Sequence, residues 1–169
     1  MIKVSIVKCS SYSSIEVQKA VKEAFDSLGG LEKFVKKGQK VLLKANLLGA
    51  HAPEAGVTTH PSIVKAVALL CKQQGARVFV GDSPADDFEK STSISGIAEA
   101  CNSAGAKLVK LSEPVEFPTL KHFAASSLFV SKKLEDFDLI INLPKLKTHV
   151  FTGFTGAVKN LYGCVPGKI

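Results

Sequence analysis

Residues 38–84, GQKVLLKANLLGAHAPEAGVTTHPSIVKAVALLCKQQGARVFVGDSP, contain a strand, a helix and a second strand. Lys40–Lys44 is a short apolar run, which is typical of a strand buried on both faces of a sheet. Thr59-His60-Pro61 predicts a helix start, because proline suits the first helical position and threonine or histidine can cap it. Helical spacing of apolar residues continues to Gly75, and Arg77–Gly81 predicts the next strand. This order predicts a parallel βαβ unit.

The same alternation extends outward in both directions along the chain. Upstream, Lys3–Lys8 alternates with period two and predicts a strand, and Ser13-x-x-Glu16 is a capping box that predicts a helix ended by Gly29-Gly30. Downstream, the patterns predict a helix over 92–104, strands over 107–111 and 137–143, an irregular or antiparallel excursion over 113–129, and a last helix over 153–161.

These elements together predict an α/β fold, doubly wound, with a mostly parallel sheet and helices on both faces. The chain has 169 residues, and no shift in composition marks a second domain. We therefore expect residues 1–169 to form a single α/β domain. Because Lys168-Ile169 comes directly after a turn, we expect this domain to be the amino-terminal portion of a longer architecture.

Charge and composition narrow the classes of partner. Lys plus Arg number 22 against 15 Asp plus Glu, a formal charge of +7, and such a balance attracts nucleic acid, anionic lipid or phosphorylated substrates. Nucleic acid is a poor candidate, because Arg77 is the only arginine and nucleic-acid readers rely on arginine forks. No apolar run approaches the roughly 20 residues that span a bilayer. The four widely spaced cysteines predict free thiols and a cytoplasmic location.

Polar side chains follow the predicted strands, and ligands of open parallel sheets bind beyond the carboxyl ends of the strands. We therefore expect the clusters to meet at one cleft. The residues predicted to bind ligand after the strands at 40–44, 77–81 and 137–143 are Lys44, Asn46, Thr59, His60, Ser83, Lys145 and Lys147. His149 is the candidate to move a proton, since the pKa of histidine lies near neutrality, and Asp82 is the candidate to orient it. A solvated lysine and a turn-capping aspartate are the simpler alternatives for Lys44 and Asp82.

A glycine- and threonine-rich segment leads into the last predicted helix. It supplies the remaining predicted ligand-binding residues, Thr155, Gly156, Lys159 and Asn160, since amides at a helix N-terminus can bind phosphate. Its spacing is neither that of a P-loop nor that of a Rossmann fingerprint. The histidines show no local metal-ligand spacing, so no metal site is predicted. Gly-x-Ser-x-Gly is absent, which argues against a Ser83–His149–Asp82 triad.

Several of these motifs occur in the same order in one known family. They are VSIVKC over 4–9, GQKVLLKAN over 38–46, TTHP over 58–61, VGDSP over 80–84, NLPKLKTH over 142–149 and TGAVKNLYG over 155–163. With these motifs the chain resembles the domain of unknown function 362 family over nearly all of its length. That family is also distantly similar to the amino-terminal part of nickel-pincer lactate racemases, which implies a small hydroxy-acid or nucleotide-like ligand.

The resemblance implies an association with iron–sulfur proteins, because many members of the family carry a ferredoxin-like module that binds 4Fe-4S clusters. This chain has no Cys-x-x-Cys-x-x-Cys run, so any such cluster is expected on an associated module outside these 169 residues. Other cofactors are not predicted. Two hypotheses follow: an enzyme, or the substrate-binding half of one, that acts on an anionic metabolite, and a non-catalytic module that docks a ferredoxin-like electron carrier.

Overall fold

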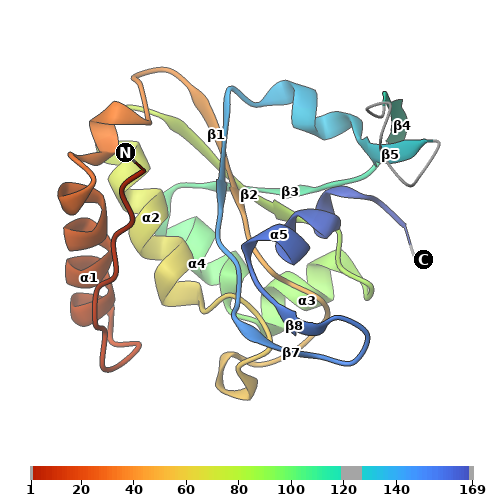
Figure 1. Ribbon diagram of the computed structural model, residues 1–169, viewed down its shortest axis with the longest axis horizontal. Coiled ribbons are helices and arrows are strands. Elements are labelled where there is room, and N and C mark those ends of the chain that lie inside the picture. The colour runs from red at the N-terminus through yellow and green to blue at the C-terminus, as the bar shows by residue number, and fades with distance from the viewer. Residues whose placement is uncertain (1, 119–126, 168–169) are drawn as a thin grey trace.

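A four-stranded parallel sheet forms the centre of the computed structural model, which describes residues 2–118 and 127–167 (Figure 1). The strands are β1 (Lys40–Lys44), β2 (Arg77–Asp82), β3 (Lys107–Lys110) and β6 (Leu139–Asn142), in the order β3-β2-β1-β6. Lys44 lies opposite Gly81 on one side and opposite Asn142 on the other. The chain therefore steps from β1 towards β3 and later returns to the other side of β1, which makes the junction of β1 and β6 a topological switch point.

One face of the sheet is covered by α1 (Ser14–Ser27), α2 (Pro61–Gln73) and α4 (Ile97–Ala104). Val41 and Leu43 of β1 and Val78 and Val80 of β2 point to this side and are fully or nearly fully buried. Their alternation with residues of the opposite face follows from the period of two in a strand. This face holds the main hydrophobic core, to which α2 contributes Val64, Val67, Ala68 and Cys71.

The opposite face of the sheet has a smaller core. Leu42, Leu111 and Cys164 are buried there, and Phe79 and Phe137 meet edge to face with ring centroids 5.2 Å apart. The covering elements are two short 3₁₀-helices, η3 (Lys132–Asp136) and η4 (Leu161–Cys164). The fold is therefore α/β, as expected, with a thicker helical layer on one side than on the other.

Two antiparallel pairs lie outside the main sheet. β4 (Pro114–Phe117) pairs with β5 (Leu128–Ser131), which confirms the antiparallel excursion predicted around 113–129, of which 119–126 lie outside the described residues. β7 (Lys147–His149) pairs with β8 (Gly153–Thr155), and α5 (Ala157–Asn160) follows. The prediction of a helix from residue 153 was wrong, because the first three of those residues extend to pair with β7.

Two other sequence predictions require correction. Residues 3–8 are extended but belong to no strand, and they run beside α1 in Figure 1. The helix predicted over 92–104 is divided into α3 (Phe88–Ile94) and α4 by Gly96, whose φ of 71° breaks the helical path. Glycine adopts this left-handed conformation without the steric cost that other residues bear.

The remaining short elements are η1 (Leu31–Lys33) and η2 (Pro53–Ala55). Ser13 caps α1 by accepting a hydrogen bond from the amide of Glu16, as the capping box predicts. None of the helices in the described ranges combines the length and the apolar character that crossing a bilayer requires.

Candidate functional site

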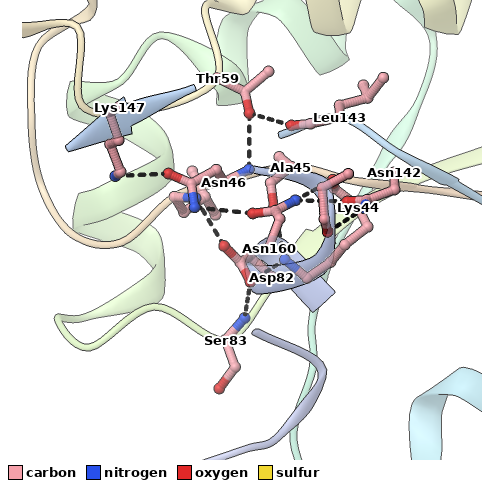
Figure 2. Close-up of polar contacts among 12 residues, drawn as sticks. Lys44, Ala45, Asn46, Thr59, Asp82, Ser83, Asn142, Leu143, Lys147 and Asn160 are labelled. Carbon is pink, nitrogen blue, oxygen red and sulfur yellow. Dashed lines mark hydrogen bonds and ion pairs between the residues drawn. The ribbon is translucent and has the colours of Figure 1, made fainter. Parts of the chain in front are cut away.

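A buried ion pair lies where β1 and β2 end. The ammonium of Lys44 is 2.6 Å from the carboxylate of Asp82, and the two side chains are 0% and 5% exposed (Figure 2). The Lys44 ammonium also donates a hydrogen bond of 2.7 Å to the carbonyl of Ala45. Lys44 is therefore committed to the framework of the sheet, and it does not line the cavities of this region.

Asp82 is held by backbone amides in addition to Lys44. One carboxylate oxygen accepts from the amide of Leu47 at 2.7 Å, and the other accepts from that of Ser83 at 2.8 Å. A carboxylate that accepts from three donors is locked in place. These contacts tie the loop after β1 to the loop after β2, whereas His149, which Asp82 was expected to orient, lies in β7.

Side-chain amides form a chain of hydrogen bonds across the carboxyl edge (Figure 2). The Asn46 side-chain Nδ2 donates to Oδ1 of Asn160 at 2.9 Å. The Nδ2 of Asn160 in turn donates to Oδ1 of Asn142 at 2.8 Å. Asn160 also donates to the main-chain carbonyls of Lys44 and Ala45. The network joins β1, β6 and α5, and it uses most of the hydrogen-bonding capacity of Asn160, which is 2% exposed.

Lys147 extends this network from the β7–β8 hairpin. Its ammonium donates to the carbonyl oxygen of the Asn46 side chain at 2.9 Å and to the main-chain carbonyl of Val57 at 2.6 Å. Partial burial and, to a lesser degree, the positive charge of Lys159 lower the pKa of Lys147, although the Asp82 carboxylate counteracts them. Lys147 therefore fastens the hairpin to the sheet.

Thr59 and His60 hold the turn before α2. The Thr59 hydroxyl accepts from the amide of Asn46 at 2.8 Å and donates to the carbonyl of Leu143 at 2.6 Å, so it joins the ends of β1 and β6. His60 caps α2, and its ring stacks on Tyr12 with centroids 3.8 Å apart. Burial and the neighbouring Lys145 ammonium lower the pKa of His60, with an opposing effect from Glu54.

His149 lies at the end of β7 beside the base of the hairpin turn. Its Nδ1 accepts hydrogen bonds from the amides of Phe151 and Thr152 at 3.2 and 3.3 Å. These bonds require an unprotonated Nδ1, so the neutral ring carries its hydrogen on Nε2. Desolvation and the charges of Lys159 and Lys147 lower the pKa of His149, which favours that neutral ring.

A polar cavity of about 490 Å³ opens beyond the ends of β1 and β2. Asn46, Asp82, Ser83, Lys159 and Asn160, all predicted from the sequence, contribute to its wall. The Ser83 hydroxyl makes no hydrogen bond, and the Lys159 ammonium no ion pair, to any residue within 2–118 and 127–167. These two groups are free to meet a ligand.

Sequence reasoning missed several residues of this wall: Leu48, Asp86, Tyr162 and Gly163. Gly163 packs directly on the buried ion pair, since a Cβ there would overlap the Asp82 carboxylate and lie 2.7 Å from the Lys44 ammonium. Asp86 follows the turn after β2. It could have been found by extending the polar cluster that ends at Pro84 by two residues. No local pattern distinguishes Gly163 from a helix-ending glycine.

A second, mostly apolar cavity of about 730 Å³ lies between the β7–β8 hairpin and α5. Phe151, Phe154 and Val158 line it, together with the predicted residues His149 and Gly156. Lys159 and Tyr162 line both cavities, and the Lys159 ammonium is 5.7 Å from the centre of the Tyr162 ring. Lys159 therefore stands at the boundary between a polar and an apolar space.

The remaining predicted residues are outside both cavities. These are Lys44, Thr59, His60, Lys145, Lys147 and Thr155. Thr155 is 2% exposed, and its hydroxyl has no hydrogen-bond partner among the described residues. α5 has four residues, so it offers only a weak helix dipole for phosphate. In the described part of the chain, His, Cys, Asp and Glu form no group of three that could hold a metal ion.

Comparison with known proteins gives one family and one curated relative. The model of the family described as "Domain of unknown function (DUF362)" matches residues 41–169. A protein named as thylakoid-associated in Synechocystis is 41% identical over 171 residues, which cover 98% of this chain and 51% of the relative. The chain thus spans about half the length of that relative. With the family model matching most of its residues, the chain belongs to the DUF362 family.

Proposed function

We propose that this domain binds an anionic small molecule, a metabolite or cofactor bearing a phosphate or carboxylate, at the carboxyl ends of its strands. The observation that carries the proposal is the cavity of about 490 Å³ at the ends of β1 and β2, whose wall includes the Lys159 ammonium, which has no ion pair among the described residues. Cavities of about 300–1,000 Å³ are typical of small-molecule sites. Because Lys44 already neutralises Asp82, Lys159 contributes the charge available to a ligand.

The other groups in the wall narrow the chemistry of the ligand. Ser83 offers a hydroxyl, and Asp86 contributes a carboxylate that accepts from the amide of Ala50. An anionic wall group repels a polyphosphate but accepts a hydrogen bond from a hydroxyl or amine. The arrangement therefore favours a ligand with one anionic group near Lys159 and at least one donor group near Asp86.

His149 lines the second cavity rather than the polar one, and the role that its geometry favours there is that of a hydrogen-bond donor. Its Nδ1 is occupied by two backbone amides, which leaves an Nε2–H in the neutral ring. A ring held in this way can donate to an anion, and it loses two hydrogen bonds if Nδ1 takes a proton. The geometry favours donation over the proton transfer expected from the sequence.

The broader role rests on the family resemblance. We propose that the domain acts as the substrate-binding part of a redox-linked enzyme in the cytoplasm, with any 4Fe-4S cluster on an associated module. Four free cysteines, three of them buried, support a reducing compartment. The Synechocystis relative is by name associated with thylakoids.

A second candidate function is docking of a ferredoxin-like electron carrier. The observation that favours it is the β7–β8 hairpin, whose tip residues Val150 and Phe151 are 94% and 90% exposed and follow Lys145 and Lys147 in the chain. An apolar surface near lysines suits an acidic partner. Against it, Lys147 is turned inward by its bonds to Asn46 and Val57, which leaves fewer free charges on the surface.

The ligand proposal is tested by a thermal-shift screen with inorganic phosphate, small hydroxy acids, mononucleotides and acidic ferredoxin, at low and moderate salt. A ligand at about 100 times its Kd adds roughly 2.7 kcal/mol of stability. We expect a rise in Tm from one class of small anion that persists at moderate salt. A rise from ferredoxin alone, lost at moderate salt, would favour docking instead.

Two lysine variants, one inside the polar cavity and one outside it, test whether the anion binds in that cavity. Lys159→Met is expected to lower the affinity for the anion about 10-fold or more, because hydrogen bonds to charged groups contribute about 1.5–3 kcal/mol. Lys110→Met, which removes an exposed lysine from β3, is the control and is expected to bind normally. Equal affinity in both variants would refute the site.

A further inference from the structure

The amino-terminal segment, residues 2–8, has the sequence pattern of a strand but lies in no sheet formed by the described residues. Its apolar residues Ile2, Val4 and Ile6 are 94%, 80% and 94% exposed. Fully burying one such side chain contributes about 1.5–3 kcal/mol, so their exposure leaves a large driving force for association unused. An apolar face of this kind on an extended segment is typical of a strand that is buried against a partner.

The backbone of the same segment is also unpaired. Within 2–118 and 127–167, no backbone–backbone hydrogen bond involves residues 2–8. The segment is nevertheless anchored by side chains, because the Ser27 hydroxyl donates to that of Ser5 at 2.6 Å and Tyr12 stacks on His60. It is therefore an extended segment held in position with its backbone hydrogen-bonding groups available.

The anchors also give the direction of the segment. Ser5 lies at the carboxyl end of α1, whereas Tyr12 lies at the carboxyl edge of the sheet, where its hydroxyl accepts from Lys145 at 3.1 Å. The segment thus runs towards the edge at which β1 and β6 end, as Figure 1 shows. It is parallel to β6.

β6 is one of the two edge strands of the main sheet. It stands at the end of the sheet order, its sequence Leu-Ile-Ile-Asn carries no charge, and Ile140 is 38% exposed. The opposite edge, β3, begins and ends with the exposed residues Lys107 and Lys110, and charged residues of this kind discourage edge pairing. The chain therefore protects one edge of its sheet and leaves the other suited to pairing.

We infer that residues 2–8 and the free edge of β6 together receive β-structure from a second polypeptide unit, which extends the sheet beyond β6. The occupant to which we commit is a unit equivalent to the part of the Synechocystis relative outside the match, since that relative is about twice as long as the matched region. A second copy of this chain fits less well. The unpaired segment that it offers in its described residues is 2–8, which would have to leave the contact between Ser5 and Ser27.

Hydrogen exchange on this chain tests the inference directly. The remaining part of the Synechocystis relative is produced as a separate polypeptide, or is co-expressed with this chain if circular dichroism shows it unfolded alone. In the isolated chain, the amides of residues 3–8 are expected to exchange rapidly at every protein concentration. With the added unit, we expect at least a 100-fold slowing in residues 3–8 and in the outward amides of residues 139–142.

Each alternative result overturns the inference. Slow exchange in the dilute isolated chain would mean that residues 2–8 already pair within the chain. Slowing that depends on the concentration of this chain alone would identify a second copy as the partner. Absence of a complex after co-expression, or a complex without slowing in residues 3–8, would also exclude the proposed pairing.

Two variants test whether the apolar face of residues 2–8 is the surface that contacts the added unit. Val4→Lys combined with Ile6→Lys is expected to weaken the complex at least 10-fold, because it places two charges on the buried face. Ile94→Lys changes an apolar residue that is 42% exposed on α3 and serves as the control. Unchanged affinity in the double variant would overturn the inference.

Discussion

The ammonium of Lys44 and the carboxylate of Asp82 meet at 2.6 Å beneath the polar cavity, and neither side chain is more than 5% exposed. The two residues come from adjacent parallel strands, and Asp82 also accepts from two backbone amides. This ion pair links the ends of β1 and β2, so the cavity depends on a neutralised charge pair.

Removing one partner of this pair is expected to destabilise the fold. Lys44→Met leaves the Asp82 carboxylate buried without its counter-charge, and breaking a buried pair in this way costs about 3–5 kcal/mol. Lys44→Met combined with Asp82→Asn is expected to recover part of that loss. Urea unfolding of both variants measures the difference, and a double variant less stable than Lys44→Met would contradict the account.

Gly163 is expected to be intolerant of a side chain. Gly163→Ala places a Cβ against the Asp82 carboxylate and the Lys44 ammonium, and overpacking of this kind costs about 1–3 kcal/mol. Gly156→Ala is the control, because its Cβ would meet only the Phe154 ring, at 3.3 Å. Thermal unfolding compares the two, and equal Tm values would show that the region around the ion pair can relax.

Asn160 is expected to stabilise the carboxyl edge through its side-chain amide. Asn160→Asp removes the donor that serves Asn142 and two main-chain carbonyls, and it places a carboxylate beside these acceptors. A buried acceptor left without its donor costs about 1–3 kcal/mol. We expect Asn160→Asp to be less stable than Asn160→Ala at neutral pH in chemical denaturation, and the reverse order would argue against the assigned hydrogen bonds.

The pKa of His149 is expected to lie below 6.5 in an NMR titration, since desolvation, Lys159 and Lys147 all oppose its protonation. A histidine whose folded pKa is depressed binds fewer protons folded than unfolded. Its contribution to stability is therefore present above the unfolded pKa and is lost as pH falls through the folded pKa. Lys159→Met is expected to raise the pKa of His149, whereas Lys110→Met should leave it unchanged.

The four thiols are expected to differ in reactivity. Burial raises the pKa of Cys71 and of Cys101 to about 12, and it also raises that of Cys164, while Cys9 is exposed. Thiolate is the reactive form, so Ellman's reagent should modify Cys9 first in the native protein. Cys71 and Cys101 should react only on unfolding, and their rapid reaction in the native state would contradict the described core.

The sequence was most informative where local pattern and tertiary environment agree. The strand at Lys40–Lys44 and the helix start at Pro61 were predicted correctly, because continuous burial and an N-terminal proline each leave a local signature. The prediction failed over residues 153–155, where pairing with β7 overrides the helical pattern. It also failed over residues 3–8, where a strand pattern finds no partner within the described residues.

For the candidate site, the sequence identified the edge of the sheet but not the bonding within it. Asn46 and Ser83, predicted because polar clusters follow parallel strands, line one cavity with Asn160, which was predicted from the glycine- and threonine-rich segment. Which side chains remain free depends on contacts between distant segments, such as Lys147 with Asn46, and no local spacing encodes them. No local sequence feature separates Lys159 from Lys147, yet among the described residues it is the Lys147 ammonium that bonds to the main chain, at the carbonyl of Val57.

The hydrogen bond between Asn46 and Asn160 joins positions 114 residues apart, and β6 must be added beside β1 before it can form. Contacts of such long sequence separation carry a loop-closure cost and form late during folding. During synthesis, the βαβ unit from β1 to β2 can fold while the residues that complete the cavity are still in the ribosome. The cavity is therefore expected to be the last part of the domain to assemble, and ligand to bind only after α5 has left the ribosome.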